Sequence, residues 1–535
     1  MAGWSVRLHS ALSRHLPLLL KSRHALNRAA PHLAVGVVAL YIATFTALSI
    51  LKLALLRQGF DMAGNEQTIW NTLHGRPFRT SIFAFMDYDF DDGPVLLQLP
   101  LALLYGIHPA PSTLLFLQTV ALGLAAWPLY LVGRELLPEP WHALALVLLY
   151  LLHPTTQHIN LYEFQLRAFL LPFALGSLLF LRWEWWWPYV ACLLLMIATK
   201  TEAGFTLVAF GLYALLTRRS WHFVLPPLLI GPLWVVLALG VIVPHFSRGD
   251  FIRDIYRYGV LGNSIGEVIW NLATNPLRFL HTVMSTPEKL TYVGLLFGIQ
   301  GFLALLSPTT LLALPVLAMN LIAPNRVQFS LNYQYPALVY PFLLVAAAEG
   351  VMVVARGVAH LRKNRATATG TGKEDEEDEE DAPYAHGVAN AGMALLVVGA
   401  LVANVALNNV VLGLLRHHES AARVADARAI IAQVPPGVPL AASSFLAPHL
   451  AQREELFFFP GNQSYPRAYL ARAEYLVADR HAPGMSQEER ELLHDYLHRP
   501  DWEIVAQEGD FVLLRRVRYD RGEEGERQHG EEVGT

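Results

Sequence analysis

Acidic residues that could take part in catalysis follow the first long apolar run of this 535-residue chain. Asp61 comes soon after that run, and Glu66 and Trp70 are spaced four residues apart, which places them on one face of a helix. A carboxylate held just above the hydrocarbon of a membrane can accept a proton from a hydroxyl group, so Asp61 is a candidate general base. Aspartate is also a good residue for starting a helix, and this alternative stays open.

A second acidic stretch contains four carboxylates within six residues. Hard divalent cations such as Mg²⁺ or Mn²⁺ prefer oxygen ligands, so the stretch is a candidate metal site. The spacing matches no complete calcium loop, and a solvated turn before an apolar helix has the same composition, so both interpretations stay open. The four residues are Asp87, Asp89, Asp91 and Asp92.

Polar residues also interrupt the ends of several later apolar runs. An ionisable group at membrane depth is costly and is therefore a functional candidate. In the topology inferred below, these groups reach the same side of the membrane as Asp61, which predicts one active cavity at the outer surface. Lys200 and Glu202 also fit a neutralised structural pair. The candidates are Glu163, Arg167, Lys200, Glu202, Arg326 and Tyr333.

The composition predicts a membrane protein. Hydrophobic residues make up 54% of the chain and charged residues only 16%, against roughly 25% charged residues in soluble domains. The net charge of -4 argues against a nucleic-acid partner. The single cysteine, Cys192, excludes a disulfide bond within the chain, so cysteine usage does not indicate the redox compartment.

Long apolar runs predict a mainly α-helical, polytopic transmembrane bundle. Five runs are long enough to cross a bilayer, which takes about 20 residues: 33–55, 112–133, 221–243, 336–356 and 388–414. Six shorter runs fit tilted spans or buried core helices: 141–153, 168–181, 186–199, 203–217, 291–306 and 309–322. Together they predict about eleven spans.

Basic residues near the ends of these runs predict the orientation. If the basic N-terminus, residues 1–32, is cytoplasmic, all of these basic residues fall on the cytoplasmic side. The transmembrane domain, 33–414, then has large outer loops at 57–111 and 244–290. The protein is therefore expected to be a multi-pass protein of the cell membrane with its C-terminal end outside.

The remaining segments differ in composition from the spans. The loop 366–386 contains a dense run of glutamate and aspartate residues, which cannot bury apolar area. This run predicts a disordered cytoplasmic loop. Residues 415–519 are expected to form a small extracytoplasmic α/β domain, and the polar tail 520–535 is expected to be disordered. The domain is predicted to have strands at 438–445, 455–459, 474–479 and 503–516, and helices at 446–453 and 486–498.

Several short motifs recur together in one known family. By these motifs, the chain from about residue 33 to 516 resembles the predicted membrane proteins grouped as domain of unknown function 2079. The motifs are Phe60-Asp61 through Gln67 and Trp70, Gly93-Pro94, Leu114-Leu115 with Gln118, Trp127-Pro128-Leu129-Tyr130, Lys200 with Glu202, Asn332-Tyr333 before Pro341-Phe342, Val438 with Ala441, and Pro448-His449-Leu450 with Arg453.

That family in turn resembles the polytopic GT-C glycosyltransferases, which take a sugar from a polyprenyl-phosphate donor on the outer face. The resemblance implies a GT-C-like hexosyltransferase that acts on an envelope acceptor, with membrane lipids and the donor as partners. Asp61 would deprotonate or orient the acceptor hydroxyl, and Lys200 and Arg326 would hold the donor phosphate. Glu66, Gln67 and Trp70 would bind substrate beside Asp61.

The sequence departs from the family pattern at four positions. Asp91, Gln165 and Asn332 stand where histidine is usual, and Arg167 stands where an acid is usual. The resemblance therefore does not extend to a shared metal site, and it is compatible with a changed substrate or with lost activity.

Two other functions fit the same sequence. A transporter of lipid or glycan would also have broken helices and intramembrane charges, although the chain shows no internal repeat. A non-catalytic scaffold for envelope assembly would use the outer domain to bind partners.

Overall fold

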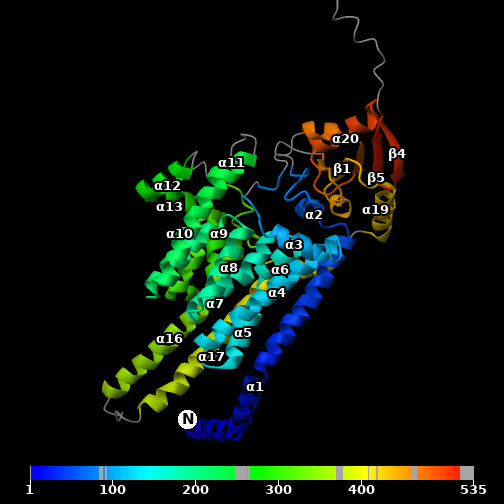
Figure 1. Ribbon diagram of the computed structural model, residues 1–535. Coiled ribbons are helices and arrows are strands. Elements are labelled where there is room, and N and C mark those ends of the chain that lie inside the picture. Colours follow the sequence, from blue (N-terminus) through cyan, green and yellow to red (C-terminus); the bar gives the residue numbers. More distant parts are fainter. Residues whose placement is uncertain are drawn as a thin grey trace, which may run out of the picture. The chain divides into compact units, whose positions relative to one another are not determined.

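The computed structural model describes residues 2–83, 88–90, 93–246, 262, 265–368, 377–407, 409–416, 420–460 and 467–517 (Figure 1). The chain divides into two compact units. The first unit comprises Met1–Lys52, Phe90–Leu101 and Ser112–His417, and the second comprises Leu53–Asp89, Ala102–Pro111 and His418–Thr535.

Five helical stretches are long and apolar enough to cross a membrane, and each contains most of one of the five long runs predicted from the sequence. They are Ala25–Ala54 in α1 (Ala2–Ala54), α4 (Pro111–Leu136), Trp221–Phe246 in α10 (Trp221–Leu237), η2 (Ala238–Ile242) and α11 (Val243–Phe246), Tyr340–Arg365 in α16 (Tyr340–Ala368), and Tyr384–Arg416 in α17 (Glu377–Ala406) and α18 (Val410–Arg416).

The six shorter runs are also helical. Four of them, α5, α7, α8 and α9, have only 13 or 14 residues, or about 20 Å of helix against a hydrocarbon core of about 30 Å. Their polar ends must therefore be enclosed by protein or face water, and the total of about eleven spans stays a prediction. The helices are α5 (Pro140–Leu152), α7 (Leu170–Arg182), α8 (Trp186–Thr199), α9 (Ala203–Leu216), α14 (Pro287–Gly298) with η4 (Leu303–Leu306), and η5 (Pro308–Ala313) with α15 (Leu314–Ile322).

Several segments predicted as loops contain helices. The segment 244–290, predicted as an outer loop, includes α12 (Ile265–Thr274) and α13 (Pro276–Val283). The prediction of a disordered loop over 366–386 is wrong at both ends, because α16 continues to Ala368 and α17 begins at Glu377. Glutamate favours helix, and an existing helix extends readily by single residues. Residues 369–376 and the tail 520–535 lie outside the described residues.

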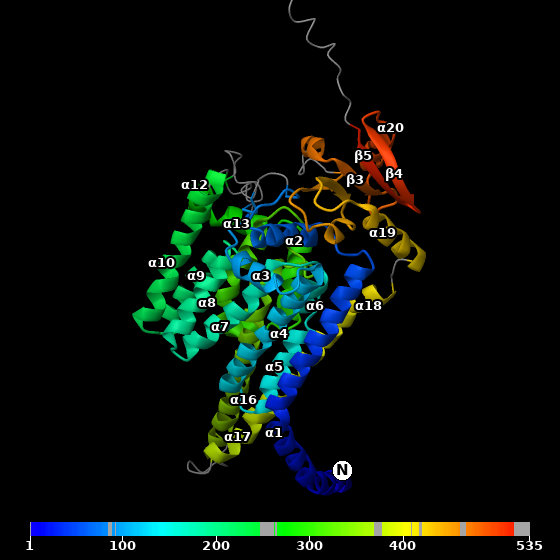
Figure 2. The same cartoon turned by 45° about the vertical axis from the view of Figure 1, so that its right-hand side comes forward.

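Helices α8, α9 and α10 lie side by side (Figures 1 and 2). At the contact between α9 and α10, backbone meets backbone. A Cβ atom added to Gly204 would lie 2.9 Å from the carbonyl oxygen of Gly231, and one added to Gly231 would lie 2.5 Å from the carbonyl oxygen of Gly204. Small residues allow this kind of close packing between apolar helices, where the hydrophobic effect contributes little.

The second unit contains a five-stranded sheet with the order β2-β1-β3-β5-β4. The strands β1, β2 and β3 are parallel, and the β4–β5 hairpin pairs antiparallel to β3 through β5. The three short predicted strands are confirmed, but the run 503–516 is a hairpin that turns at Gly509, where φ is +52°. The strands are β1 (Leu440–Ser443), β2 (Leu456–Phe459), β3 (Tyr475–Asp479), β4 (Trp502–Glu508) and β5 (Phe511–Arg516).

Alternating side chains of the strands feed two cores, one on each face of the sheet. One core includes α19 (Ala421–Gln433), which the sequence did not predict, together with Leu56, Ala63 and Ile82 from the segment after α1. The other includes α20 (Gln487–His498). The predicted 415–519 domain is thus completed by most of the predicted first outer loop, which contains α2 (Phe60–Leu73) and the end of α3 (Gln98–Tyr105).

Candidate functional site

In the first unit, a buried ion pair joins two of the predicted residues. Arg167 in η1 (Leu166–Phe169) is 6% exposed and binds Glu202 through two hydrogen bonds of 2.8 Å, from Nε to Oε1 and from Nη2 to Oε2. Glu202 precedes the first residue of α9, and η1 leads directly into α7. The ends of two short apolar helices therefore bring the charges together. A bidentate guanidinium–carboxylate pair is strong and fixes the orientation of both groups.

One aromatic ring faces this pair, and two others lie close to it in sequence. The Arg167 guanidinium lies 5.0 Å from the ring centroid of Tyr335, at the start of η6 (Tyr335–Leu338). Two residues earlier, Tyr333 contacts Tyr162 edge to face at 5.1 Å, and Lys52 lies 5.8 Å from the Tyr162 ring. Tyr162 precedes the half-buried Glu163. The structure thus brings Arg167 and Glu202 together, whereas the convergence of these residues with Glu163 and Tyr333 in one cavity stays a prediction.

The other two predicted cations of the first unit differ in their surroundings. Lys200 is half-buried, ends α8 and lies two residues before Glu202. The side chain of Arg326 is 80% exposed and pairs with Glu288 at 3.0 Å. Arg326 therefore belongs to a surface ion pair rather than to the Arg167–Glu202 pair.

Asp61 lies in the second unit, in the first turn of α2. It is half-buried, and its backbone carbonyl accepts a 2.7 Å hydrogen bond from the Asn65 side chain. The helix begins after Gly59, so Asp61 is not its N-cap. A negative charge in the first turn of a helix is stabilised by the unpaired backbone N–H groups there, which favours the ionised form of Asp61.

Glu66 is fully buried within the second unit. Its Oε1 accepts hydrogen bonds from Tyr105 at 2.8 Å and from Gln452 at 3.2 Å, whereas Oε2 has no partner among the described residues. Burial raises the pKa of Glu66 to about 8, although both hydrogen bonds oppose the rise. Burial and the neighbouring Glu66 also raise the pKa of Tyr105, so its hydroxyl keeps its proton. Glu66 is therefore a neutral acid at pH 7, able to donate a proton or a hydrogen bond.

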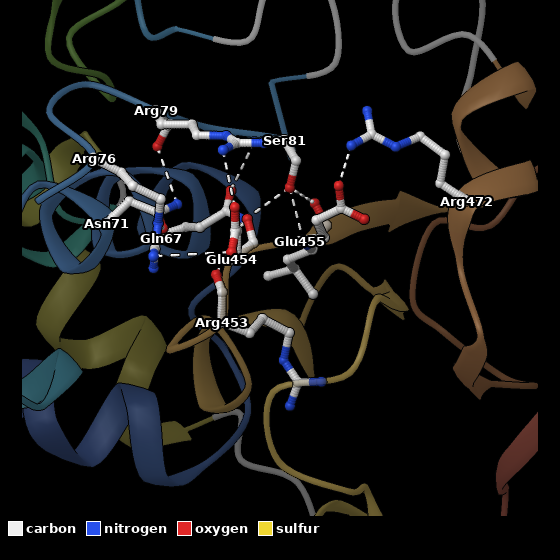
Figure 3. A network of polar contacts seen from close by, with 10 residues as sticks. Gln67, Asn71, Arg76, Arg79, Ser81, Arg453, Glu454, Glu455 and Arg472 are labelled. Atoms are coloured by element: carbon white, nitrogen blue, oxygen red, sulfur yellow. Dashed lines mark hydrogen bonds and ion pairs between the residues drawn. The ribbon is translucent and has the colours of Figure 1, made fainter. Parts of the chain in front are cut away.

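Gln67 connects three segments of the second unit (Figure 3). Its Oε1 accepts from the backbone N–H groups of Ser81 at 3.0 Å and Ile82 at 3.2 Å. Its Nε2 donates to Ser81 Oγ at 2.7 Å and to the carbonyl of Glu454 at 3.0 Å. Protein groups take up both ends of this amide, so the structure explains Gln67 by its structural role, without a substrate.

Two further side chains of α2 and its loop support the same junction. Trp70 is half-buried, stacks on His74 with ring centroids 4.1 Å apart and lies 5.4 Å from the Arg76 guanidinium. Arg79 forms a 2.9 Å ion pair with Glu454 (Figure 3). Trp70 is thus engaged by its own segment, on the same helix as Glu66.

The candidate metal site lies largely outside the described residues. Asp87, Asp91 and Asp92 belong to the residues that the structure does not describe, and Asp89 is half-buried. Among the described residues, no group of three or more histidine, cysteine or acidic side chains is arranged to hold a metal ion. The four-carboxylate site stays a prediction.

Residues missed from the sequence fall into two groups. Tyr105 and Gln452 contact Glu66 from positions 39 and 386 residues away, so no local pattern could have indicated them. Gln118 and Lys52 bind the backbone of the segment that leads to Arg167. The only signal was that Gln118 belongs to one of the recurring motifs, which gave no role for it.

Comparisons with known proteins identify the family. Two crystal structures of ArnT from Cupriavidus metallidurans, one bound to undecaprenyl phosphate and one in the apo state, are similar at 14% sequence identity and a TM-score of 0.47, over 90% of this chain and 98% of theirs. No inference rests on so distant a likeness. A search of curated proteins finds no match. The family model described as predicted membrane protein (DUF2079) matches residues 52–513, so the chain belongs to the DUF2079 family of membrane proteins.

Proposed function

We propose that this protein is a membrane glycosyltransferase that moves a sugar from a polyprenyl-phosphate donor to an acceptor hydroxyl. The observation that carries the proposal is the buried Arg167, paired with Glu202 and facing Tyr335 at the ends of short apolar helices. A guanidinium suits phosphate geometry, and apolar helices beside it suit a lipid tail. Charges in such a position are functional candidates by default.

The charge of the Arg167 region supports a site for a phosphate that gains charge. The segments that carry the pair contribute the cations Arg167, Lys200 and Lys52 and the carboxylates Glu163 and Glu202 by sequence, and Lys52 binds the backbone next to Glu163. A polyprenyl-phosphate sugar is a phosphodiester, and loss of the sugar leaves a phosphate monoester with more negative charge. An excess of positive charge stabilises that product-like state more than the donor, which accelerates transfer.

The proposed reaction is an inverting displacement. The acceptor oxygen bonds to the anomeric carbon, and the bond from that carbon to the phosphate oxygen breaks. The electron pair leaves with the polyprenyl phosphate, and the hydroxyl proton passes to a base. The family resemblance assigns this base to Asp61, and its place in the first turn of α2 favours the ionised carboxylate that a base needs.

The test is a transfer assay with the purified protein in lipid nanodiscs and a panel of polyprenyl-phosphate sugars. Wild type should transfer at least one sugar, and Asp61→Asn should lose about 100-fold or more in rate, the range typical of a removed general base. Arg167→Gln should also weaken binding of polyprenyl phosphate itself, measured without any acceptor.

Arg219→Gln is the matched control. Arg219 pairs with Glu184 at 2.7 Å just beyond the far end of α9, so the variant removes one ion pair of the same type from the same helix pair. It should leave transfer and binding unchanged. Equal transfer by Asp61→Asn and wild type would exclude Asp61 as the base. No transfer and no polyprenyl-phosphate binding by wild type would instead favour a scaffold, and binding with net lipid movement would favour a transporter.

A further inference from the structure

The segment between α6 (Pro154–Leu161) and η1 carries Glu163 and leads directly to Arg167. It begins where a helix ends, and the last carbonyl groups of a helix have no partner within the helix. In a membrane unit such groups must be satisfied by other parts of the protein, because the hydrocarbon offers no water. The partners of these carbonyl groups therefore determine the conformation of the segment.

Two side chains bind five consecutive carbonyl groups of this segment. Gln118 Nε2 in α4 donates to Ile159 at 3.3 Å, to Asn160 at 3.0 Å and to Glu163 at 3.2 Å. Lys52 Nζ in α1 donates to the carbonyl of Leu161 at 2.7 Å and to that of Tyr162. Each backbone carbonyl group from residue 159 to residue 163 thus accepts a hydrogen bond from one of these two side chains.

Gln118 also holds the far end of the segment. Its Oε1 accepts a 2.5 Å hydrogen bond from the backbone N–H of Gln165, two residues before Arg167. The side chain is fully buried, and a single amide thus binds four backbone groups spread over seven residues. Few alternative conformations of the segment could satisfy all four.

The side chain of Asn160 fixes the start of the segment independently. Its Oδ1 accepts from Ser49 and from Thr119, each at 3.1 Å, and its Nδ2 donates to Tyr41 at 3.0 Å. Ser49 and Tyr41 belong to α1 and Thr119 to α4, so the same two helices that supply Lys52 and Gln118 hold this residue. The segment is therefore attached to both long helices at its start and to α4 through Gln118 at its end.

We propose that Gln118 is a positioning residue for the donor-phosphate site: by binding the backbone from Ile159 to Gln165, it sets the position of Arg167. The inference rests on the proposed function, in which Arg167 meets the phosphate. A misplacement of about 1 Å in a binding group can cost a hundredfold in rate. Gln118 itself touches neither donor nor acceptor in this account.

The test compares Gln118→Leu and Gln118→Glu with Gln300→Leu. The leucine variant removes all four hydrogen bonds, and the glutamate variant keeps the size of the side chain but loses the N–H donors. Gln300 is fully buried in the same unit, and its amide nitrogen and oxygen have no partners among the described residues. Gln300→Leu therefore makes the same chemical change without removing a hydrogen bond to a backbone group.

The first measurement is amide hydrogen exchange of residues 159–167 in nanodiscs, which needs no activity. Both Gln118 variants should exchange faster there, by about tenfold or more, the change expected for a net loss of one or two hydrogen bonds. Gln300→Leu should match wild type. Unchanged exchange in Gln118→Glu would overturn the inference, even if Gln118→Leu fails to fold.

The second measurement is a double-mutant cycle on polyprenyl-phosphate binding. If Gln118 acts through Arg167, Gln118→Leu should weaken binding by about tenfold alone and should add almost nothing in the Arg167→Gln background. Additive effects would show that Gln118 stabilises the fold without positioning Arg167. If Arg167→Gln alone binds like wild type, the proposed function itself fails, and that outcome is distinct from faster exchange in the segment.

Discussion

Glu202 and Glu66 are two shielded carboxyl groups in different units, and their environments keep them in opposite charge states. Glu202 faces the Arg167 guanidinium through two hydrogen bonds, which favour its ionised form. Glu66 is fully buried, and within the part of the chain that the structure describes its hydrogen bonds come from the neutral groups of Tyr105 and Gln452; burial raises its pKa to about 8, which favours the protonated form at neutral pH. The charge of a buried acid is thus set by its partners.

This difference separates two chemical roles. An ionised pair can orient a guanidinium and balance its charge while a phosphate binds beside it. A neutral carboxylic acid can donate a hydrogen bond or a proton, which an ionised carboxylate cannot do. Two measurable quantities test this comparison. One is the loss of stability when Glu202 loses the positive charge of Arg167, and the other is the pH at which Glu66 releases its proton.

The largest effect is expected when Arg167 loses its charge. Arg167→Gln leaves the Glu202 carboxylate shielded from water without its cation, and breaking such a pair costs about 3–5 kcal/mol. The unfolding temperature of the purified protein in nanodiscs should fall accordingly. The double variant Arg167→Gln with Glu202→Gln should recover most of the loss, because no charge is left buried. A single variant as stable as wild type would mean that Glu202 is not charged.

The next effect is a pH dependence in the second unit. The unfolded chain releases the Glu66 proton near pH 4.5, whereas the folded unit keeps it up to about pH 8. The folded state therefore binds more protons in this window, and its stability should fall as pH rises, by at most about 1.4 kcal/mol per pH unit. Hydrogen exchange of β1 and β3 between pH 5 and 9 measures the decline. Glu66→Gln should flatten it, and a wild type whose stability rises over this window would refute the neutral acid.

A smaller effect is expected from Gln452→Ala. The Gln452 side chain lowers the pKa of Glu66 by donating to its carboxyl group, so its removal should move the pKa further up. A shift of up to about one pH unit corresponds to one lost hydrogen bond. The pH at which the decline of stability levels off should therefore increase. A shift to lower pH would show that Gln452 acts on Glu66 by a route other than this hydrogen bond.

The smallest effect is expected from Arg219→Gln. The Arg219–Glu184 pair resembles the Arg167–Glu202 pair in residue type and distance, but its side chains are 25% and 60% exposed. Exposed pairs contribute about 0–1 kcal/mol, so the unfolding temperature should hardly change. A loss as large as that of Arg167→Gln would mean that burial does not explain the difference between the two pairs.

Features that depend on one stretch of sequence were predicted well. The five long spans follow from length and hydropathy, and β1, β2 and β3 from short apolar runs. The pattern over 503–516 predicts one strand instead of the hairpin of β4 and β5, because a single glycine makes the turn within an otherwise continuous apolar pattern. Helix α19 has an alanine-rich sequence with few large apolar residues, so its periodicity was weak.

The site residues were harder to predict because their partners are distant in sequence. The spacing of Glu202 and Lys200 allows a neutralised pair between them, but the bidentate partner of Glu202 is Arg167, 35 residues earlier. The place of Arg326 at the end of an apolar run predicts that it lies with these residues. Instead it forms a surface pair with Glu288, which depends on the packing of α14. Charge and spacing indicate which residues are costly to bury, whereas only the fold decides which of them meet.

The contact between Gly204 and Gly231 has a consequence for chemistry as well as for packing. Gly204 lies two residues after Glu202, so the height of this carboxylate along the bundle is fixed where two main chains touch with only hydrogen between them. Even one methyl group there would push the start of the helix aside and carry the acid with it. These two glycines thus act as a spacer that holds Glu202 at the place from which it pairs with Arg167.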